Sequence, residues 1–377
     1  MLFGHVRAVG ATLALSLAGA ALLVAQDAPP KKDPRARLGQ PWPDAEKMRQ
    51  RREDAEARRL FQSSEPLPFT LTADFKAVNK DRKPDSTRRF PAVLSVVGDD
   101  GQARSIPVNL RTRGHSRLVQ NCAFVPLRVE FPREGVKGTP FEGQGALKLG
   151  THCHGSNEYE QYGLREYLAY RIFNLFTPRS FRVRLGRATY VDSRSGKTLV
   201  TRHAMFLESE GDLARRMAGR IAELPRAVFR NLDSETLTTM MLFQYMIGNT
   251  DFSIYVLHNV RLVQDQSRAL RPVPYDFDYS GLVNAPYALP SPVLRLKTVQ
   301  ERAWRGPCRT REELQPFLAD FRAKKSDVMA VVDSVPGLDA GSRRQAKGYL
   351  EEFYATIDDP RTLKRELVDG CGNRTGM

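Results

Sequence analysis

The strongest constraint on this chain lies in residues 242–282, where polar side chains follow an apolar stretch at short, ordered intervals. Asp251 comes directly after a tight turn, Asn259 sits on the strand-like run that follows, and Asp276 and Asp278 come after a second run. In phosphoryl-transfer sites one carboxylate orients the attacking hydroxyl, while an Asn and another carboxylate hold divalent ions. We therefore predict that Asp251 orients a hydroxyl, that Asn259 and Asp276 bind a metal, and that Asp278 assists.

Two elements upstream suit the same chemistry. Lys148 lies in an otherwise apolar strand, residues 145–149, where an ammonium group requires an anion. Residues 157–175 have helical periodicity and contain Glu166. We predict that Lys148 contacts nucleotide phosphates and that Glu166 fixes it. The alternatives are an edge-strand lysine and a surface glutamate paired with a neighbouring arginine.

A basic turn and an acidic stretch supply further candidates. The strand at residues 105–110 leads into a turn in which Arg111, Arg113 and Ser116 surround a glycine, a composition that allows close approach to phosphate oxygens. The alternative is an ordinary basic turn between strands. Glu208 follows a strand and is predicted to contact a ribose hydroxyl.

Several short motifs, spread over residues 105–285, occur together in an order typical of one group of proteins. They are Arg111-Thr112-Arg113-Gly114-His115-Ser116-Arg117, Ala146-Leu147-Lys148-Leu149, Asn249-Thr250-Asp251, His258-Asn259 and Tyr275-Asp276-Phe277-Asp278. In these motifs the chain resembles the kinase-like proteins of the spore-coat CotH and HipA group. The resemblance implies an α+β, bilobal protein-kinase-like fold with a β-rich N-terminal lobe and an α-rich C-terminal lobe. It also implies ATP, with Mg or Mn, as the ligand.

One spacing departs from the kinase pattern. Asn259 lies eight positions after Asp251, whereas protein kinases have a spacing nearer five. Two interpretations follow: a short insertion precedes the metal-binding Asn, or the site has lost its geometry.

The chain divides into four parts by composition. Residues 1–25 carry Arg7 and an apolar run, in the form of a secretory signal peptide, with an uncleaved anchor as the alternative. Residues 26–64 are polar and are predicted to be a linker followed by a solvated helix. Residues 65–208 are predicted to form the β-rich part, and residues 209–377 the α-rich part with the catalytic and metal-binding loops. No other segment is long enough to cross a membrane.

The cysteines agree with export. Four are present, none in a C-x-x-C pair, which favours two disulfides in an oxidising compartment, periplasmic or extracellular. Three pairings are possible, and proximity in sequence favours Cys122 with Cys153 and Cys308 with Cys371. Zinc binding by the histidines that flank Cys153 is the less favoured alternative, because no further ligand cluster lies nearby.

Composition limits the partners. The 377 residues carry a formal net charge of +15, which would suit an acidic partner such as a nucleotide. Because the basic residues are scattered, we interpret this charge mainly as solubility, with steering of a polyanionic substrate as the alternative. No zinc-finger, RNA-binding or helix-turn-helix pattern accompanies the scattered basic residues. Neither a Walker-type loop nor a G-x-S-x-G elbow occurs, which removes two common enzyme classes.

Two functions remain open at this stage. The first is an exported, CotH-like, ATP-dependent kinase that acts on a protein, sugar or lipid hydroxyl. The second is a kinase-fold protein of the cell envelope that has lost catalysis and serves as a scaffold or binding protein.

Overall fold

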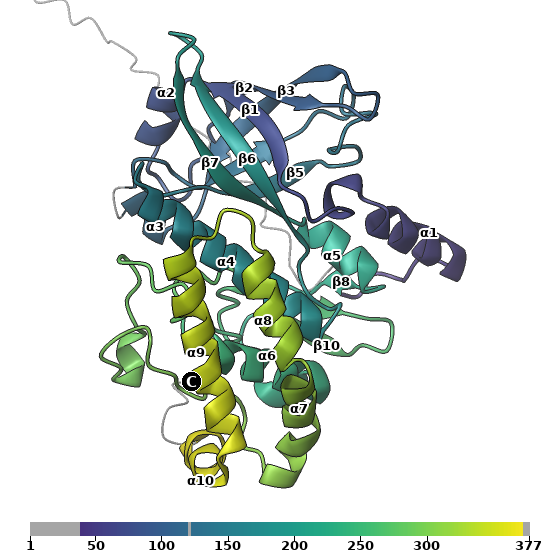
Figure 1. The fold of residues 1–377 in the computed structure, drawn as a ribbon. Coiled ribbons are helices and arrows are strands. Elements are labelled where there is room, and N and C mark those ends of the chain that lie inside the picture. Colours follow the sequence, from purple (N-terminus) through teal and green to yellow (C-terminus); the bar gives the residue numbers. More distant parts are fainter. Residues whose placement is uncertain (1–37, 120–121, 372–377) are drawn as a thin grey trace, which may run out of the picture.

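The computed structural model describes residues 38–119 and 122–371, with a β-barrel above and a helical part below it (Figure 1). The signal peptide predicted at residues 1–25 lies outside the described residues. The barrel strands are β1 Leu67–Ala73, β2 Phe90–Val97, β3 Ala103–Thr112, β4 Leu127–Glu130, β5 Ala146–Gly150, β6 Val183–Asp192 and β7 Thr198–Leu207. Their order around the barrel is β1-β2-β3-β4-β5-β7-β6.

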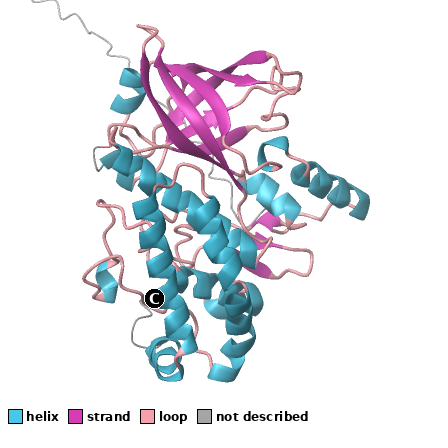
Figure 2. Ribbon diagram, viewed as in Figure 1, coloured by secondary structure: helices cyan, strands magenta, loops and turns pink. Residues whose placement is uncertain are grey.

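The predicted bilobal kinase-like fold is wrong. The seven strands close into one mixed barrel instead of forming a kinase-like N-terminal lobe (Figure 2). Closure depends on β1, which pairs antiparallel with β2 and parallel with β6, with Leu67 opposite Gly186 and Ala73 opposite Asp192. Alternation of apolar residues identifies strands, but it does not say which strands pair when they lie far apart in the chain.

The barrel has its own core. Buried and exposed side chains alternate along β2 and β3, so that Leu94, Ile106 and Leu110 point inward and are fully buried. These residues belong to a hydrophobic cluster that is separate from the cluster of the helical part. A closed barrel leaves no unpaired sheet edge, and its outer face is free to carry polar groups.

The helical part is built from longer helices and a small sheet. Its helices are α4 Asn157–Phe176, α5 Glu210–Arg216, α6 Ser234–Met246, α7 Arg311–Ala323, α8 Lys325–Ser334, α9 Ala340–Asp358 and α10 Pro360–Leu363. The small sheet is made of β8 Arg220–Ile221, β9 Val260–Gln264 and β10 Leu270–Pro274, in the order β10-β9-β8. Two short helices, α2 Phe75–Lys80 and α3 Ser116–Val119, accompany the barrel.

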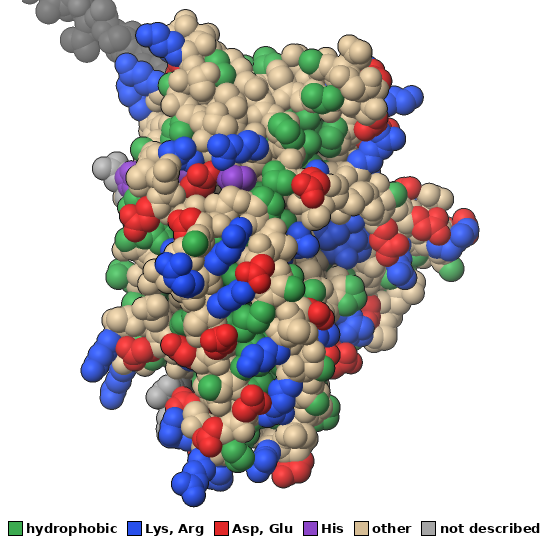
Figure 3. Space-filling view, in the orientation of Figure 1, with side chains coloured by type: hydrophobic (Ala, Val, Ile, Leu, Met, Phe, Trp, Pro, Cys, Tyr) green, Lys and Arg blue, Asp and Glu red, His purple; other side chains and the backbone are tan. Residues whose placement is uncertain are grey.

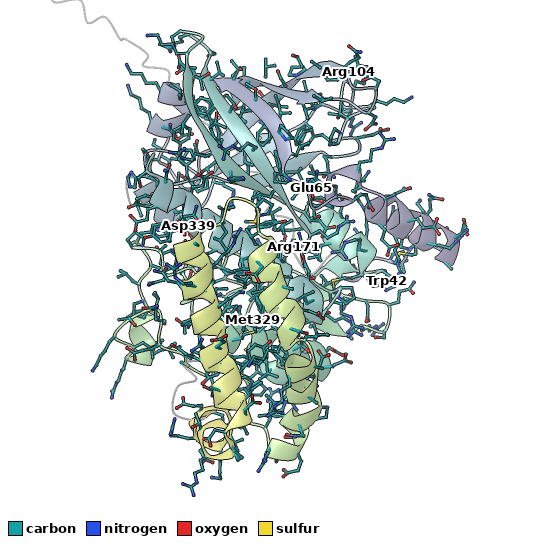
Figure 4. The ribbon with its side chains drawn as sticks, in the orientation of Figure 1. Trp42, Glu65, Arg104, Arg171, Met329 and Asp339 are labelled. Atoms are coloured by element: carbon teal, nitrogen blue, oxygen red, sulfur yellow. A yellow bond between two sulfur atoms is a disulfide. The ribbon has the colours of Figure 1, made fainter. Side chains whose placement is uncertain are left out.

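Helix α4 joins the two parts. It contacts β6 and β7 on one side and α8 and α9 on the other. Apolar residues at four-residue intervals, among them Leu164, Leu168 and Ile172, explain why one face packs inward, and all three are buried. Gln161 holds the turn before α9, because its amide donates to Gly337 O at 3.0 Å and accepts from Asp339 N at 2.9 Å. Asp339 lies at the start of α9 (Figure 4).

The segment before the barrel lies along both parts. Helix α1, Ala45–Glu56, is exposed apart from the half-buried Met48 and the buried Ala55, as expected for a solvated helix. Its flanks are anchored, since Arg220 lies over the Trp42 ring at 3.9 Å and Arg58 pairs with Asp212 at 3.3 Å. Residues 38–64 therefore include more than a linker.

Both disulfides have the predicted pairing. Cys122 is bonded to Cys153, and Cys308 to Cys371. Disulfides persist in oxidising compartments, so the pairing is compatible with a protein outside the cytoplasm. In the part of the chain that the structure describes, no helix combines the length and apolarity needed to cross a bilayer.

One histidine is sealed in the base of the barrel. His152 is 1% exposed, its ring lies 4.4 Å from that of Phe124, and neither ring nitrogen has a hydrogen-bond partner among the described residues. Burial, aided by Arg117 and Arg202, lowers the pKa of His152 to about 4. The ring is therefore neutral at pH 7.

We expect this histidine to make the fold acid-sensitive. The pKa in the folded chain lies below the ordinary 6.5, so the unfolded chain binds more protons between these values. The contribution of the neutral His152 ring to the free energy of unfolding is complete above pH 6.5. As the pH falls toward 4, this contribution is lost, by up to about 1.4 kcal/mol per pH unit. His152→Phe should flatten the profile of thermal midpoint against pH in this window, and the control His154→Gln should not. Identical profiles for wild type and His152→Phe would contradict the assignment.

Candidate functional site

A single pocket of about 350 Å³, called the site pocket below, lies where the barrel meets the helical part. Its walls come from the turn after β3, from β5 and α4, from the loop after α6 and from the segment after β10. The lining residues are Arg113, Gly114, His115, Ser116, Arg117, Pro126, Lys148, Glu166, Asp251, His258, Asn259, Tyr275, Asp276, Asp278 and Tyr279. Eight of these were candidates from the sequence: Arg113, Ser116, Lys148, Glu166, Asp251, Asn259, Asp276 and Asp278.

The turn after β3 forms the basic wall. Gly114 has φ 86°, and a Cβ built on it would meet no atom within 4 Å, so the backbone faces open space. Arg117 donates to Thr151 O, which fixes the guanidinium at the back of the pocket. Burial opposes the charged form of Arg117, but Tyr287, Asp278 and Glu166 outweigh it and raise the pKa. This guanidinium stays charged against the carboxylates.

Lys148 projects from β5 into the pocket. Its Nζ lies 3.4 Å from Glu210 Oε1 and 4.1 Å from the centre of the Tyr275 ring. Burial, reinforced by the neighbouring Arg113, lowers the pKa of Lys148 to about 8. The partner that fixes this lysine is thus Glu210, whereas the sequence analysis expected Glu166.

Glu166 faces the acidic side of the pocket instead. It projects from α4 and is 9% exposed. Burial and the charge of Asp276 raise the pKa of Glu166, although Arg117 and Arg113 oppose them. The carboxyl group lies beside residues 275–278, which contain Asp276 and Asp278 and are called the acidic element below.

The loop after α6 brings Asp251 and Asn259 into contact despite their spacing. Ser253 and His258 exchange backbone hydrogen bonds at 2.9 and 2.8 Å, which closes the intervening residues into a small loop. Asn259 Nδ2 consequently donates to Asp251 Oδ2 at 3.0 Å. The two side chains therefore meet even though eight positions separate them in the sequence.

His258 completes the contacts of Asp251. Its Nε2 lies 3.0 Å from Asp251 Oδ1, and this hydrogen bond raises the pKa of His258 against the effect of burial. The Asp251 side chain is 35% exposed, so its oxygens remain within reach of a ligand. On the other side of the loop, Arg305 donates to the carbonyls of Thr250 and Phe252 at 2.6 and 2.7 Å.

Two of the predicted metal ligands have left-handed backbones. Asn259 has φ 52° and Asp276 has φ 64°, a region that Asn and Asp adopt more readily than other residues with a Cβ. Tyr275 N donates to Asn259 O at 3.0 Å, and Asp276 N donates to Tyr170 OH at 2.7 Å. These bonds hold both residues in conformations of the kind that concentrates at functional sites.

Asp278 lies deeper than Asp276. It is 7% exposed and accepts a hydrogen bond from Tyr287 OH at 3.3 Å. Burial and the charges of Asp276 and Glu166 raise the pKa of Asp278 well above its ordinary value. The three carboxyl groups repel one another, and a bound cation would relieve that repulsion.

Two sequence candidates lie outside the site pocket. Arg111 pairs with Glu130 at 3.5 Å and donates to Ser86 O at 3.1 Å, on the neighbouring outer face of the barrel. Glu208 is buried between Arg182 and Arg216, at 2.8 Å from each. This is a structural ion-pair cluster, and the structure does not bring Glu208 to the pocket.

Sequence reasoning missed several residues of the site. Glu210 lies two positions after Glu208 at the start of α5, and it contacts Lys148 and Arg261, the latter at 3.0 Å. The pattern Glu208-Ser209-Glu210 does not show which glutamate faces Lys148, because the direction of each side chain depends on where β7 ends and α5 begins. Arg117 also lines the pocket, but its place at the end of the basic-turn motif predicted no contact for it.

No model of a known protein family matches the chain, and no curated protein matches it in sequence. The resemblance to the CotH and HipA group stays a prediction.

Close packing of the turn after α6 against α9 can be tested by substitution of Gly248. Gly248 has φ 62°, and a Cβ there would lie 1.9 Å from Tyr349 OH of α9. We expect Gly248→Ala to destabilise the fold by at least about 2 kcal/mol, from left-handed strain and displacement of the tyrosine.

Gly348→Ala is the matched control in denaturant unfolding. Gly348 is exposed within α9, and a Cβ there meets nothing within 4 Å, so alanine should stabilise the protein by about 0.5–1 kcal/mol. Equal effects of the two substitutions would contradict the close packing of the turn.

Proposed function

We propose that the site pocket binds a nucleoside triphosphate with a divalent cation and transfers its terminal phosphoryl group to a hydroxyl. One observation supports this above all others. A lysine, a basic turn, an Asn and four carboxylates, from five separate segments, line one pocket. Phosphoryl transfer depends mainly on positioning and charge stabilisation. The proposal therefore rests on these groups and not on the fold.

The residues fit a hard cation such as Mg²⁺ or Mn²⁺. Asp276, Asp278 and the amide oxygen of Asn259 offer oxygen ligands, which these ions prefer. Within residues 38–119 and 122–371, no group of three or more His, Cys, Asp and Glu side chains could hold a metal by itself. Mg²⁺ sites do not need such a group, because they commonly combine one or two carboxylates with substrate phosphates and water. When bound, the ion would neutralise phosphate charge.

The cations of the pocket suit the phosphates. Lys148 is a point charge held by Glu210 and aimed into the pocket, and Arg113 and Arg117 offer planar forks for phosphate oxygens. The open backbone at Gly114 allows an oxygen to approach closely. Arg111 and Glu208 have no part in this proposal.

Asp251 is suited to orient the acceptor. His258 and Asn259 hold its two oxygens in place, and each carboxylate oxygen retains a lone pair for a further hydrogen bond. In the transfer the acceptor oxygen bonds to the γ-phosphorus and the bond from that phosphorus to the β,γ-bridging oxygen breaks. The hydroxyl proton passes to Asp251, and the nucleoside diphosphate leaves.

The compartment is part of the proposal. The two disulfides suit an oxidising environment, and we extend this to export to the periplasm or the exterior by the signal peptide predicted at residues 1–25. The inactive envelope scaffold, the other function considered, drew its support from the long spacing between Asp251 and Asn259. The contact between these residues despite that spacing supports the catalytic alternative.

Ligand-dependent stabilisation tests the proposal. ATP with Mg²⁺ or Mn²⁺ should stabilise the folded protein by about 2.7 kcal/mol at a hundredfold excess over the dissociation constant, and neither should do so alone. Asp276→Asn should abolish the shift in thermal midpoint, and Lys148→Met should reduce it. Asp251→Asn should keep the shift and lose transfer to the acceptor.

The matched control is Asp333→Asn, an exposed carboxylate of α8 paired with Lys347. It should behave as wild type. If no nucleotide, tested with either metal, shifts the midpoint of the wild-type protein, the proposal is wrong.

A further inference from the structure

A second groove of about 350 Å³ opens on the outer face of the barrel beside the site pocket. Among its lining residues are Asp85, Ser86, Arg111, Arg113, Arg128 and Glu130, and we call it the side groove. Arg113 and Gly114 line both cavities, so the two are continuous around this turn. We propose that the side groove binds an acidic polypeptide segment of the acceptor, next to the hydroxyl that enters the site pocket. This inference rests on the proposed function.

Strand register gathers positive charge in the groove. Arg111 of β3 is directly opposite Arg128 of β4, and Arg128 is directly opposite Lys148 of β5. Side chains directly opposite share one face of a sheet, and Leu127 and Val129 on either side of Arg128 are buried in the barrel core. The three cations therefore form a row on the outer face, from the groove to the site pocket.

Such a row is costly without an anion. Like charges directly opposite on neighbouring strands destabilise a sheet. The ends of the row are compensated, because Arg111 pairs with Glu130 and Lys148 pairs with Glu210. Arg128, in the middle, has no hydrogen bond or ion pair with any described residue, and the side chain of Arg113 has none either. The Nε atoms of Arg111 and Arg113 are also buried without a partner.

The chemistry of the groove favours carboxylates on a peptide. A guanidinium fork matches a carboxylate with two parallel hydrogen bonds. Glu130 and Asp85 lie among the arginines, so a uniformly charged polyanion such as a nucleic acid would meet repulsion at fixed points. Figure 3 shows one face of the molecule, on which basic and acidic side chains are interspersed. In the side groove itself, Arg111 and Arg128 lie beside Glu130. A short segment with spaced acidic side chains fits this pattern.

Fluorescence anisotropy with defined probes tests the inference. The first probe is a labelled peptide with one serine flanked by Asp and Glu, the second is the same peptide with Asn and Gln, and the third is a short polyphosphate. We expect the acidic peptide to bind, the amide peptide to bind at least about tenfold more weakly, and added salt to weaken binding. Arg128→Gln should weaken acidic-peptide binding about tenfold.

Arg104→Gln is the matched control, since Arg104 lies on β3 at the far end of the barrel hairpin and pairs with Asp100 (Figure 4). It should leave binding unchanged. Equal affinity for acidic and amide peptides, no effect of Arg128→Gln, or tighter binding of polyphosphate than of the acidic peptide would each overturn the inference.

The two proposals fail separately. Arg128→Gln should keep the stabilisation by ATP and metal, because Arg128 does not line the site pocket. If stabilisation persists while no acidic peptide binds, the side groove is wrong and the proposed function stands. If acidic peptides bind through Arg128 but no nucleotide stabilises the protein, the groove binds peptides and the phosphotransferase proposal fails.

Discussion

The packing of Phe277 holds the candidate site together. Its ring is fully buried, 4.6 Å from the Tyr170 ring of α4 and 5.4 Å from the Phe243 ring of α6. Asp276 and Asp278 flank this ring, so its position determines theirs. Asp276 and Asp278 remain close to each other and to Glu166 of α4 because the buried Phe277 ring between the two aspartates packs against Tyr170 of the same helix. Charge repulsion at the site is thus balanced by packing elsewhere.

Helix α4 extends this dependence to the rest of the molecule. One helix carries Glu166 and Tyr170 toward the acidic element, contacts β6 and β7 of the barrel, and packs against α8 and α9. The barrel in turn presents Lys148 and the basic turn. Cations and carboxylates therefore belong to different parts of the structure and meet only because α4 joins these parts.

The sequence predicted the elements better than their assembly. The helix at 157–175, the strands around Lys148 and the hairpin before the basic turn are present, because apolar periodicity and turn residues report local structure. The closed barrel was missed, because the parallel pairing of β1 with β6 joins strands more than a hundred residues apart. Within the site, residues of the turns at 251 and 276 met as expected, whereas the partner of Lys148 depended on where α5 begins. Glu208 and Glu210 differ by two positions in sequence, and only the fold decides which one faces the lysine.

The central claim is that Asn259, Asp276 and Lys148 hold a metal-bound nucleotide in the site pocket. Anomalous diffraction from crystals grown with Mn²⁺ and a non-hydrolysable ATP analogue tests it most directly. The account predicts a manganese peak within about 2.0–2.3 Å of oxygens of Asp276 and Asn259 or Asp278, with phosphates against Lys148 and the turn at Gly114. Manganese and nucleotide bound at another place on the molecule, with this pocket filled only by water, would contradict it.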